Sequence, residues 1–179
     1  MKTNIILTTI AFFLVMGSCK KNHVPIPDYI SYREINKLII ASESDSIDDS
    51  CVSMVFYFLK DSDSSYHINI RHDRTNAICD AYYSLKTDPQ TEFITPLEKN
   101  ANIFNDSFWY SSNFLSLDNF SGAGERYIGY RECANHSGDD LFYYGWIKVK
   151  VSQNNDSILI ISRATNLAEG NSILAGQTD

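Results

Sequence analysis

One segment near the C-terminal end of the chain restricts the possible fold more than any other. Between Leu141 and Ser152, the apolar residues Ile147, Val149 and Val151 alternate with two lysines. A period of two belongs to a β-strand, whose successive side chains point to opposite faces, whereas a helix repeats every 3.6 residues. The alternation therefore predicts a strand with one face in a core and the other in water, as in many antiparallel sheets.

A hairpin is predicted upstream of that strand. Cys51 to Lys60 is dense in β-branched and aromatic residues, Asp61 to Ser65 is rich in turn formers, and Tyr66 to Arg71 alternates apolar and polar residues. Because both faces of the first segment are apolar, we expect that strand to lie centrally in its sheet.

The rest of the chain continues as short strands between turns rich in Ser, Asn, Asp and Gly. We expect further strands at 32–42, 77–85, 93–96, 108–110, 126–132, 157–164 and 172–174, and a solvated acidic loop at 42–50. Apolar spacing over Asp28 to Ala41 also fits a helix, but the downstream pattern favours a strand there. The predicted fold is all-β, a single antiparallel β-sandwich of the jelly-roll or lectin-like kind over residues 28–179.

The N-terminal segment has the pattern of an export signal. Lys2 precedes a twelve-residue apolar run from Ile5 to Met16, which is shorter than the about 20 residues that a membrane-spanning helix needs. Two small residues and Cys19 follow directly. The segment resembles a bacterial lipobox.

That resemblance implies a signal peptide at residues 1–18, a lipidated Cys19 that becomes the first residue after cleavage, and a polar tether over 19–27. The alternative is an ordinary signal peptide that is cut nearby and leaves Cys19 as a plain thiol. Under the lipobox interpretation the chain is anchored in a bacterial cell-envelope membrane, and Lys20 after the cysteine favours the outer membrane. Two or more acyl chains anchor a protein stably where one does not.

The charge of the mature chain argues against one class of partner. The first eighteen residues contain one lysine and no acidic residue, so their removal leaves 161 residues with 14 basic and 22 acidic side chains, a formal charge of −8. That length suits one domain. An acidic domain lacks the basic surface that phosphate backbones require, so nucleic acid is not an expected partner.

Three further cysteines stand at Cys51, Cys79 and Cys133. An exported protein can form disulfides, and three thiols allow one pair, which could be any two of these residues. Their wide spacing lacks the Cys-x-x-Cys pattern of zinc sites. We therefore expect no metal and no other cofactor.

The C-terminal third carries a recognisable order of features. These are Trp109, Asn119-Phe120, Arg126 to Arg131, Tyr144-Gly145-Trp146, Ala164-Thr165-Asn166 and Ala175-Gly176-Gln177. The order resembles the C-terminal block of a family of secreted bacterial proteins, many of them lipoproteins, with a Tyr-Gly-Trp strand and a terminal Ala-Gly-Gln. The resemblance implies a β-sandwich and supplies no established activity.

Two groups of side chains are candidates for binding. Tyr144, Trp146 and Lys148 share one face of the predicted strand and could form an aromatic platform for a sugar ring, although large aromatics usually pack in a core. His67, Asn69 and Arg71 share the outward face of the second hairpin strand, where they could bind polar groups or simply be solvated.

No recognisable reaction centre accompanies these groups, because no Gly-x-Ser-x-Gly elbow is present and the acidic pairs lie adjacent in sequence. The sequence therefore favours a non-enzymatic, lipid-anchored envelope module that binds an envelope protein or a glycan. A carbohydrate-binding module that uses surface aromatics is the alternative, and a glycan-active hydrolase is less favoured.

Overall fold

The computed structural model describes residues 30–41, 45–49, 52–60, 66–72, 83–91, 93–105, 108–110, 115–133 and 142–179. Residues 1–18, Cys19, the tether at 19–27, Cys51, Cys79 and the side chain of Cys133 lie outside this part. Signal cleavage, lipidation and disulfide pairing therefore stay predictions. Within the described ranges, no helix has the length and apolar character needed to cross a membrane.

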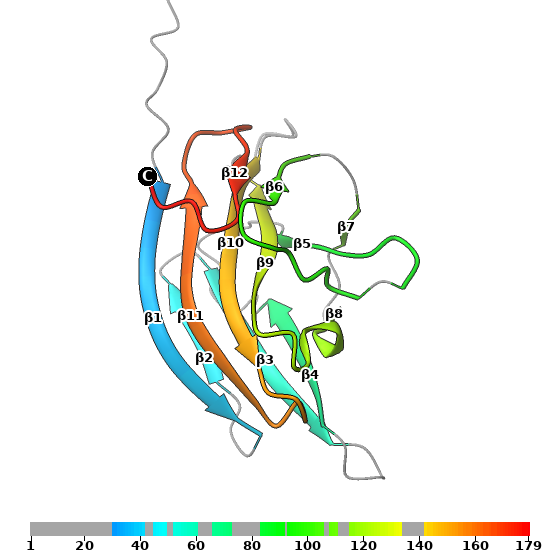
Figure 1. Cartoon of the computed structure of the whole chain (residues 1–179). Helices are drawn as coiled ribbons and strands as arrows, with labels where there is room; N and C mark the ends of the chain where they lie inside the picture. Colours follow the sequence, from blue (N-terminus) through cyan, green and yellow to red (C-terminus); the bar gives the residue numbers. More distant parts are fainter. Residues whose placement is uncertain are drawn as a thin grey trace, which may run out of the picture.

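The described strands pair in an antiparallel manner and form three sheets (Figure 1). The six-stranded sheet has the order β1 (Ile30–Ile40), β11 (Ser157–Asn166), β10 (Phe142–Val151), β9 (Glu125–Cys133), β5 (Tyr83–Lys86) and β7 (Trp109–Tyr110). The four-stranded sheet has the order β2 (Asp45–Asp49), β3 (Val52–Lys60), β4 (Tyr66–His72) and β8 (Leu115–Ser116). The third sheet pairs β12 (Ile173–Leu174) with β6 (Asn102–Ile103), and a 3-10 turn, η1 (Asp118–Phe120), follows β8.

The all-β, antiparallel class is thus confirmed. The predicted hairpin is β3 and β4, and β3 lies between β2 and β4, as its two apolar faces predict. The helical alternative for 28–41 is wrong, because β1 pairs with β11 from Ile30 to Ile40. The strand predicted at 93–96 is also wrong, since Ile94 makes only an isolated bridge to Thr87.

The acidic loop predicted at 42–50 contains a strand instead. Asp45–Asp49 forms β2 and pairs with β3 over five residues. Asp and Ser have low strand propensity. Pairing uses backbone groups only, however, and a polar strand is tolerated at the edge of a sheet, where it also discourages further association.

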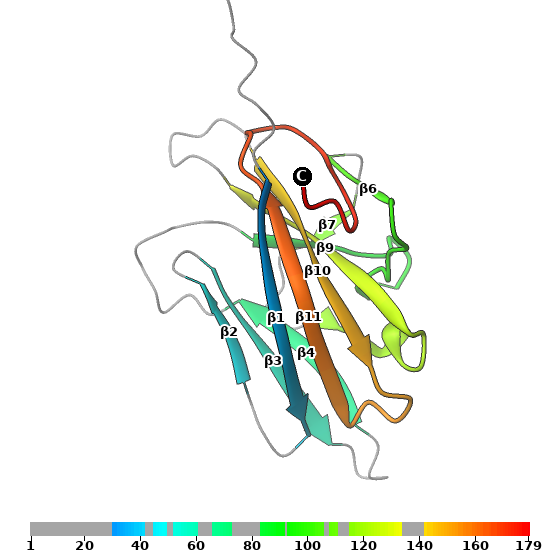
Figure 2. The same ribbon diagram turned by 60° about the vertical axis from the view of Figure 1, so that its left-hand side comes forward.

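The larger hydrophobic core lies between the six-stranded and four-stranded sheets. It contains Phe56 of β3 and Ile68 of β4 together with Ile39, Ile128 and Ile147 of the facing sheet, all at most 2% exposed. The two sheets therefore lie face to face, as Figure 2 shows from the side. Each such side chain stabilises the fold by about 1.5–3 kcal/mol relative to its exposed state.

A second core lies on the opposite face of the six-stranded sheet. Tyr144 and Trp146 of β10 pack there with Ile103 of β6, Ile173 of β12 and the adjacent Ala175. Strand β10 is therefore buried on both faces from Tyr144 to Ile147. The predicted exposed face begins only at Lys148, which is half-buried, and includes the exposed Lys150.

A tyrosine ring crosses this sheet over a glycine. Tyr130 of β9 stands opposite Gly145 of β10 in the antiparallel register. The Tyr130 hydroxyl donates to the carbonyl oxygen of Ala164 at 3.2 Å and also hydrogen-bonds the hydroxyl of Thr165. The ring occupies the space that a side chain at Gly145 would need, which explains why a glycine separates the two aromatic residues of β10.

Candidate functional site

The predicted aromatic platform does not exist as a surface. Tyr144 is 2% exposed and Trp146 is 1% exposed. The C-terminal segment covers Trp146, whose indole Nε1 donates to the carbonyl oxygen of Gln177 at 3.1 Å. The ring of Tyr127 packs edge-on against the indole with centroids 5.3 Å apart. The prediction is wrong because a distant segment folds over a face that the strand pattern alone leaves open.

Lys148, the third residue of that predicted platform, is engaged in an ion pair. Its Nζ atom lies 2.5 Å from Oε2 of Glu125 on the neighbouring strand. The hydrogen bond raises the pKa of Lys148 and lowers the pKa of Glu125, against an opposing effect of burial on each. Lys148 therefore forms a cross-strand ion pair with Glu125, close to the buried Trp146 on the same strand.

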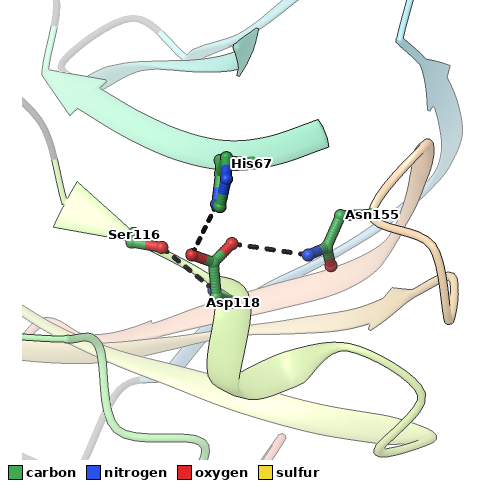
Figure 3. Close-up of polar contacts among 4 residues, drawn as sticks. All are labelled: His67, Ser116, Asp118 and Asn155. Carbon is green, nitrogen blue, oxygen red and sulfur yellow. Dashed lines mark hydrogen bonds and ion pairs between the residues drawn. The ribbon is translucent and has the colours of Figure 1, made fainter. Parts of the chain in front are cut away.

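A polar cluster at the other end of the molecule brings together three distant parts of the chain (Figure 3). Nδ1 of His67 on β4 lies 2.8 Å from Oδ2 of Asp118 in η1. Nδ2 of Asn155, in the turn between β10 and β11, donates to Oδ1 of the same carboxylate at 3.4 Å. We name His67, Asp118 and Asn155 the polar cluster.

Local structure holds each member of the polar cluster in position. The backbone N–H of Asp118, the first residue of η1, donates to Oγ of Ser116 at 3.1 Å. Asn155 has a φ of 54°, in the left-handed region that asparagine enters more readily than most residues. The turn is closed by Oγ of Ser152, which accepts the backbone N–H of Asp156 at 3.0 Å.

The polar cluster is accessible from solvent. The side chains of His67 and Asp118 are 37% and 29% exposed. A carboxylate has about four acceptor positions, and the contacts to His67 and Asn155 use two of them. The cluster can therefore accept hydrogen bonds from a ligand while β4, η1 and the turn between β10 and β11 hold its geometry.

The sequence singled out His67 alone among these residues. Its outward orientation is confirmed, because the neighbouring Ile68 is fully buried on the other face of β4. The side chains of Asn69 and Arg71 lie outside the described residues. Asp118 and Asn155 were missed, since they stand 51 and 37 residues from their partners and no local motif links them.

A second group of side chains lies where β10 begins. The guanidinium of Arg131 stands 4.2 Å from the ring centre of Phe142 and 5.2 Å from that of Trp109. The rings of Phe104 and Trp109 pack on Tyr144, with centroids 5.7 and 5.9 Å away. We name Phe104, Phe108, Trp109, Arg131 and Phe142 the aromatic end.

The aromatic end is only partly closed. Phe104 is 40% exposed and Phe108 is 55% exposed. Phe108 also has a φ of 52°, which is uncommon for a bulky residue. The sequence identified Trp109 only as part of a family-like order, because stacking on Arg131 depends on the register of β9 and β10.

No group of three or more His, Cys, Asp and Glu side chains in the described ranges could hold a metal ion. Comparison with known proteins gave no match to a family model, a curated protein or a solved structure. The family resemblance of the C-terminal block therefore stays a prediction.

Proposed function

We propose that this chain is a lipid-anchored protein of the bacterial cell envelope, at the outer membrane, and that its β-sandwich domain is a non-enzymatic binding module for an envelope protein or a glycan. The lipobox-like segment ending at Cys19 supports the anchor. Two sheets that face each other across a common core support the sandwich.

The observation that carries the binding role is the polar cluster. Three separate elements hold His67, Asp118 and Asn155 together at the end of the domain away from the start of β1 (Figures 1 and 3). A tethered domain presents that end to its surroundings. The partly exposed carboxylate of Asp118, fixed beside His67, suits a partner rich in hydrogen-bond donors.

Recognition fits this geometry better than catalysis does. Both oxygens of the Asp118 carboxylate hold a neighbouring side chain, and its backbone N–H is held by Ser116. The remaining acceptor positions of the carboxylate suit hydrogen bonds from a bound partner, whereas a general acid or base must also gain or release the reacting proton of a substrate. These contacts indicate that Asp118 positions the side chains of His67 and Asn155 at the surface.

The second candidate function is a carbohydrate-binding module, whose ligand is a glycan. Its aromatic platform cannot be Tyr144 and Trp146, which are buried. The polar cluster offers another route, because sugar hydroxyls can donate to the acceptor positions of the Asp118 carboxylate.

We predict that Asn155→Gly weakens binding at least about tenfold, which corresponds to about 1.4 kcal/mol. Glycine accepts the left-handed backbone of residue 155 and removes only the amide that holds Asp118. The measurement uses the mature chain with Cys19→Ala on a glycan array and against purified outer-membrane proteins, followed by titration of the best binder. Asn154→Gly, at the exposed neighbouring position of the same turn, is the matched control. Equal affinities for the two variants would remove the polar cluster as the site.

We also predict that Cys19→Ala moves the protein from the membrane fraction to the soluble fraction and abolishes labelling by radioactive palmitate, because the thiol that carries the lipid is gone. The control is Ser18→Ala, which keeps a small residue at the cleavage position. Unchanged labelling of Cys19→Ala would show that the anchor proposal is wrong.

A further inference from the structure

Strand β1 begins at the same end of the six-stranded sheet as the aromatic end. Ile30 of β1 pairs with Asn166 of β11, Asn166 pairs with Tyr144 of β10, and Tyr144 pairs with Arg131 of β9. One row across the sheet therefore joins the start of β1 to the arginine of the aromatic end. Figures 1 and 2 agree, since β1 starts at the same end of the molecule as β6 and β12.

The chain length before Ile30 limits how far this end can stand from a lipid on Cys19. Ten residues lie between Cys19 and Ile30, so eleven residue-to-residue steps join the two. They span at most about 40 Å when fully extended and about 18 Å on average if flexible. The polar cluster lies farther from the lipid than the aromatic end does, by the length of the ten-residue strand β10, which is about 33 Å.

The end nearest the anchor also exposes apolar and aromatic side chains. Phe104 and Phe108 are joined there by Leu167, which is 44% exposed and directly follows Asn166 of the shared row. The turn that contains Leu167 lies against β10, because the backbone N–H of Gly170 donates to the carbonyl oxygen of Phe142 at 2.9 Å. Phe104 contacts Tyr144 of the same row.

This combination matches the headgroup region of a bilayer. Tryptophan is enriched there because its ring has an apolar body and a polar N–H. Phenylalanine and leucine side chains insert into the apolar boundary just below the headgroups. Arg131 holds these rings in place, because its guanidinium lies over the rings of Phe142 and Trp109. Its Nη1 atom also donates to Oδ1 of Asn105 at 2.7 Å. We propose that the aromatic end, with Leu167, seats on the lipid headgroup layer of the membrane that holds Cys19, so that the polar cluster faces away from that membrane. This inference rests on the lipid anchor of the proposed function.

The contact is mainly apolar. Acidic Glu132 and Glu169 lie at the same end as Arg131, and Glu169 accepts a hydrogen bond from the Tyr143 hydroxyl at 3.1 Å. Burial and this neighbouring carboxylate raise the pKa of Tyr143, which keeps the phenol neutral. The seating should therefore persist at about 0.5 M salt, where exposed charges are screened within a few ångströms.

The test replaces the lipid by an artificial anchor. Residues 20–179 with an N-terminal hexahistidine are bound to vesicles of phosphatidylethanolamine and phosphatidylglycerol that contain a nickel-chelating lipid. Amide hydrogen exchange is compared with that of the same protein released by imidazole. We expect exchange over residues 102–105, 108–110 and 166–170 to slow at least about fivefold on the vesicles, and the turn at 152–157 to be unchanged.

A triple variant, Phe104→Ser, Phe108→Ser and Leu167→Ser, should lose this slowing. The control triple, Leu38→Ser, Ile40→Ser and Phe93→Ser, removes three apolar side chains of similar exposure elsewhere and should keep it. Slowing at 152–157 instead, absence of slowing, or equal loss in both triples would overturn the proposal. Two further outcomes would also overturn it. Slowing without vesicles as the protein concentration rises would assign this end to a second copy of the chain. Slowing only after an envelope protein or glycan is added would assign it to that partner.

The artificial anchor separates this inference from the proposed function. If Cys19 carries palmitate in cells but the vesicle experiment shows no slowing, only the seating is wrong. If slowing occurs but Cys19 is not labelled, the lipid anchor is wrong, and the aromatic end contacts a bilayer only when the chain is tethered to it by other means.

Discussion

Gly145→Ala should destabilise the domain by about 3 kcal/mol or more, because overpacking a filled core forces side chains and backbone out of their minima. A Cβ atom at this position would overlap the ring and hydroxyl of Tyr130 and would lie 2.6 Å from the carbonyl oxygen of Ala164. Tyr130 cannot withdraw freely, since its hydroxyl is bonded to Ala164 and Thr165. Urea unfolding of the mature chain with Cys19→Ala measures the loss. Such a loss is a large share of the about 5–15 kcal/mol that stabilises a typical domain.

Gly129→Ala is the matched control on the neighbouring strand. A Cβ atom there would meet Cδ1 of Leu97 at 3.1 Å and Cβ of Lys86 at 3.4 Å. The tip of a leucine can shift by a few tenths of an ångström, so we expect a loss of about 1 kcal/mol or less. If Gly145→Ala is no more damaging than Gly129→Ala, the account of the Tyr130 crossing is wrong.

Removal of residues 173–179 should lower the free energy of unfolding by about 4 kcal/mol, from lost burial and a lost hydrogen bond. Ile173 and Ala175 are fully buried, and Gln177 accepts the indole N–H of Trp146. The chain has two tryptophans, so a Trp109→Phe background isolates Trp146. Its fluorescence should shift to longer wavelength in the truncated protein as water reaches the indole.

A shorter truncation provides the comparison. Deleting only Thr178 and Asp179, both exposed, leaves the covering segment in place and should change stability by at most about 0.5 kcal/mol. Unshifted Trp146 fluorescence in the longer truncation would mean that another part of the protein covers this ring.

Much of the strand pattern could be predicted from the sequence because it depends on local periodicity. The alternation that ends at Val151 places Ile147 and Val149 in the core between the sheets, as predicted. The double-sided apolar segment Val52–Lys60 is the central strand of its sheet. Strand β2 could not be predicted in this way, since its pairing is made by backbone groups and its acidic side chains favour a loop.

The candidate sites were much less predictable. Trp146 was expected to have one of two environments, and local sequence could not decide between them because the covering segment lies about thirty residues later. His67 was recognised as an outward polar residue, but Asp118 and Asn155 meet it only through the packing of β4, η1 and the turn after β10. The stacking of Arg131 on Trp109 and Phe142 likewise depends on the strand register.

The sequence by itself determined that the chain is all-β and antiparallel and which side chains along β10 share a face, because a strand alternates its side chains whatever surrounds it. It also carries the lipobox-like pattern at Cys19. Only the tertiary structure decided what covers each face. Segments far apart in the chain meet there, and that contact buries Trp146, assembles the polar cluster and sets the aromatic end beside the start of β1.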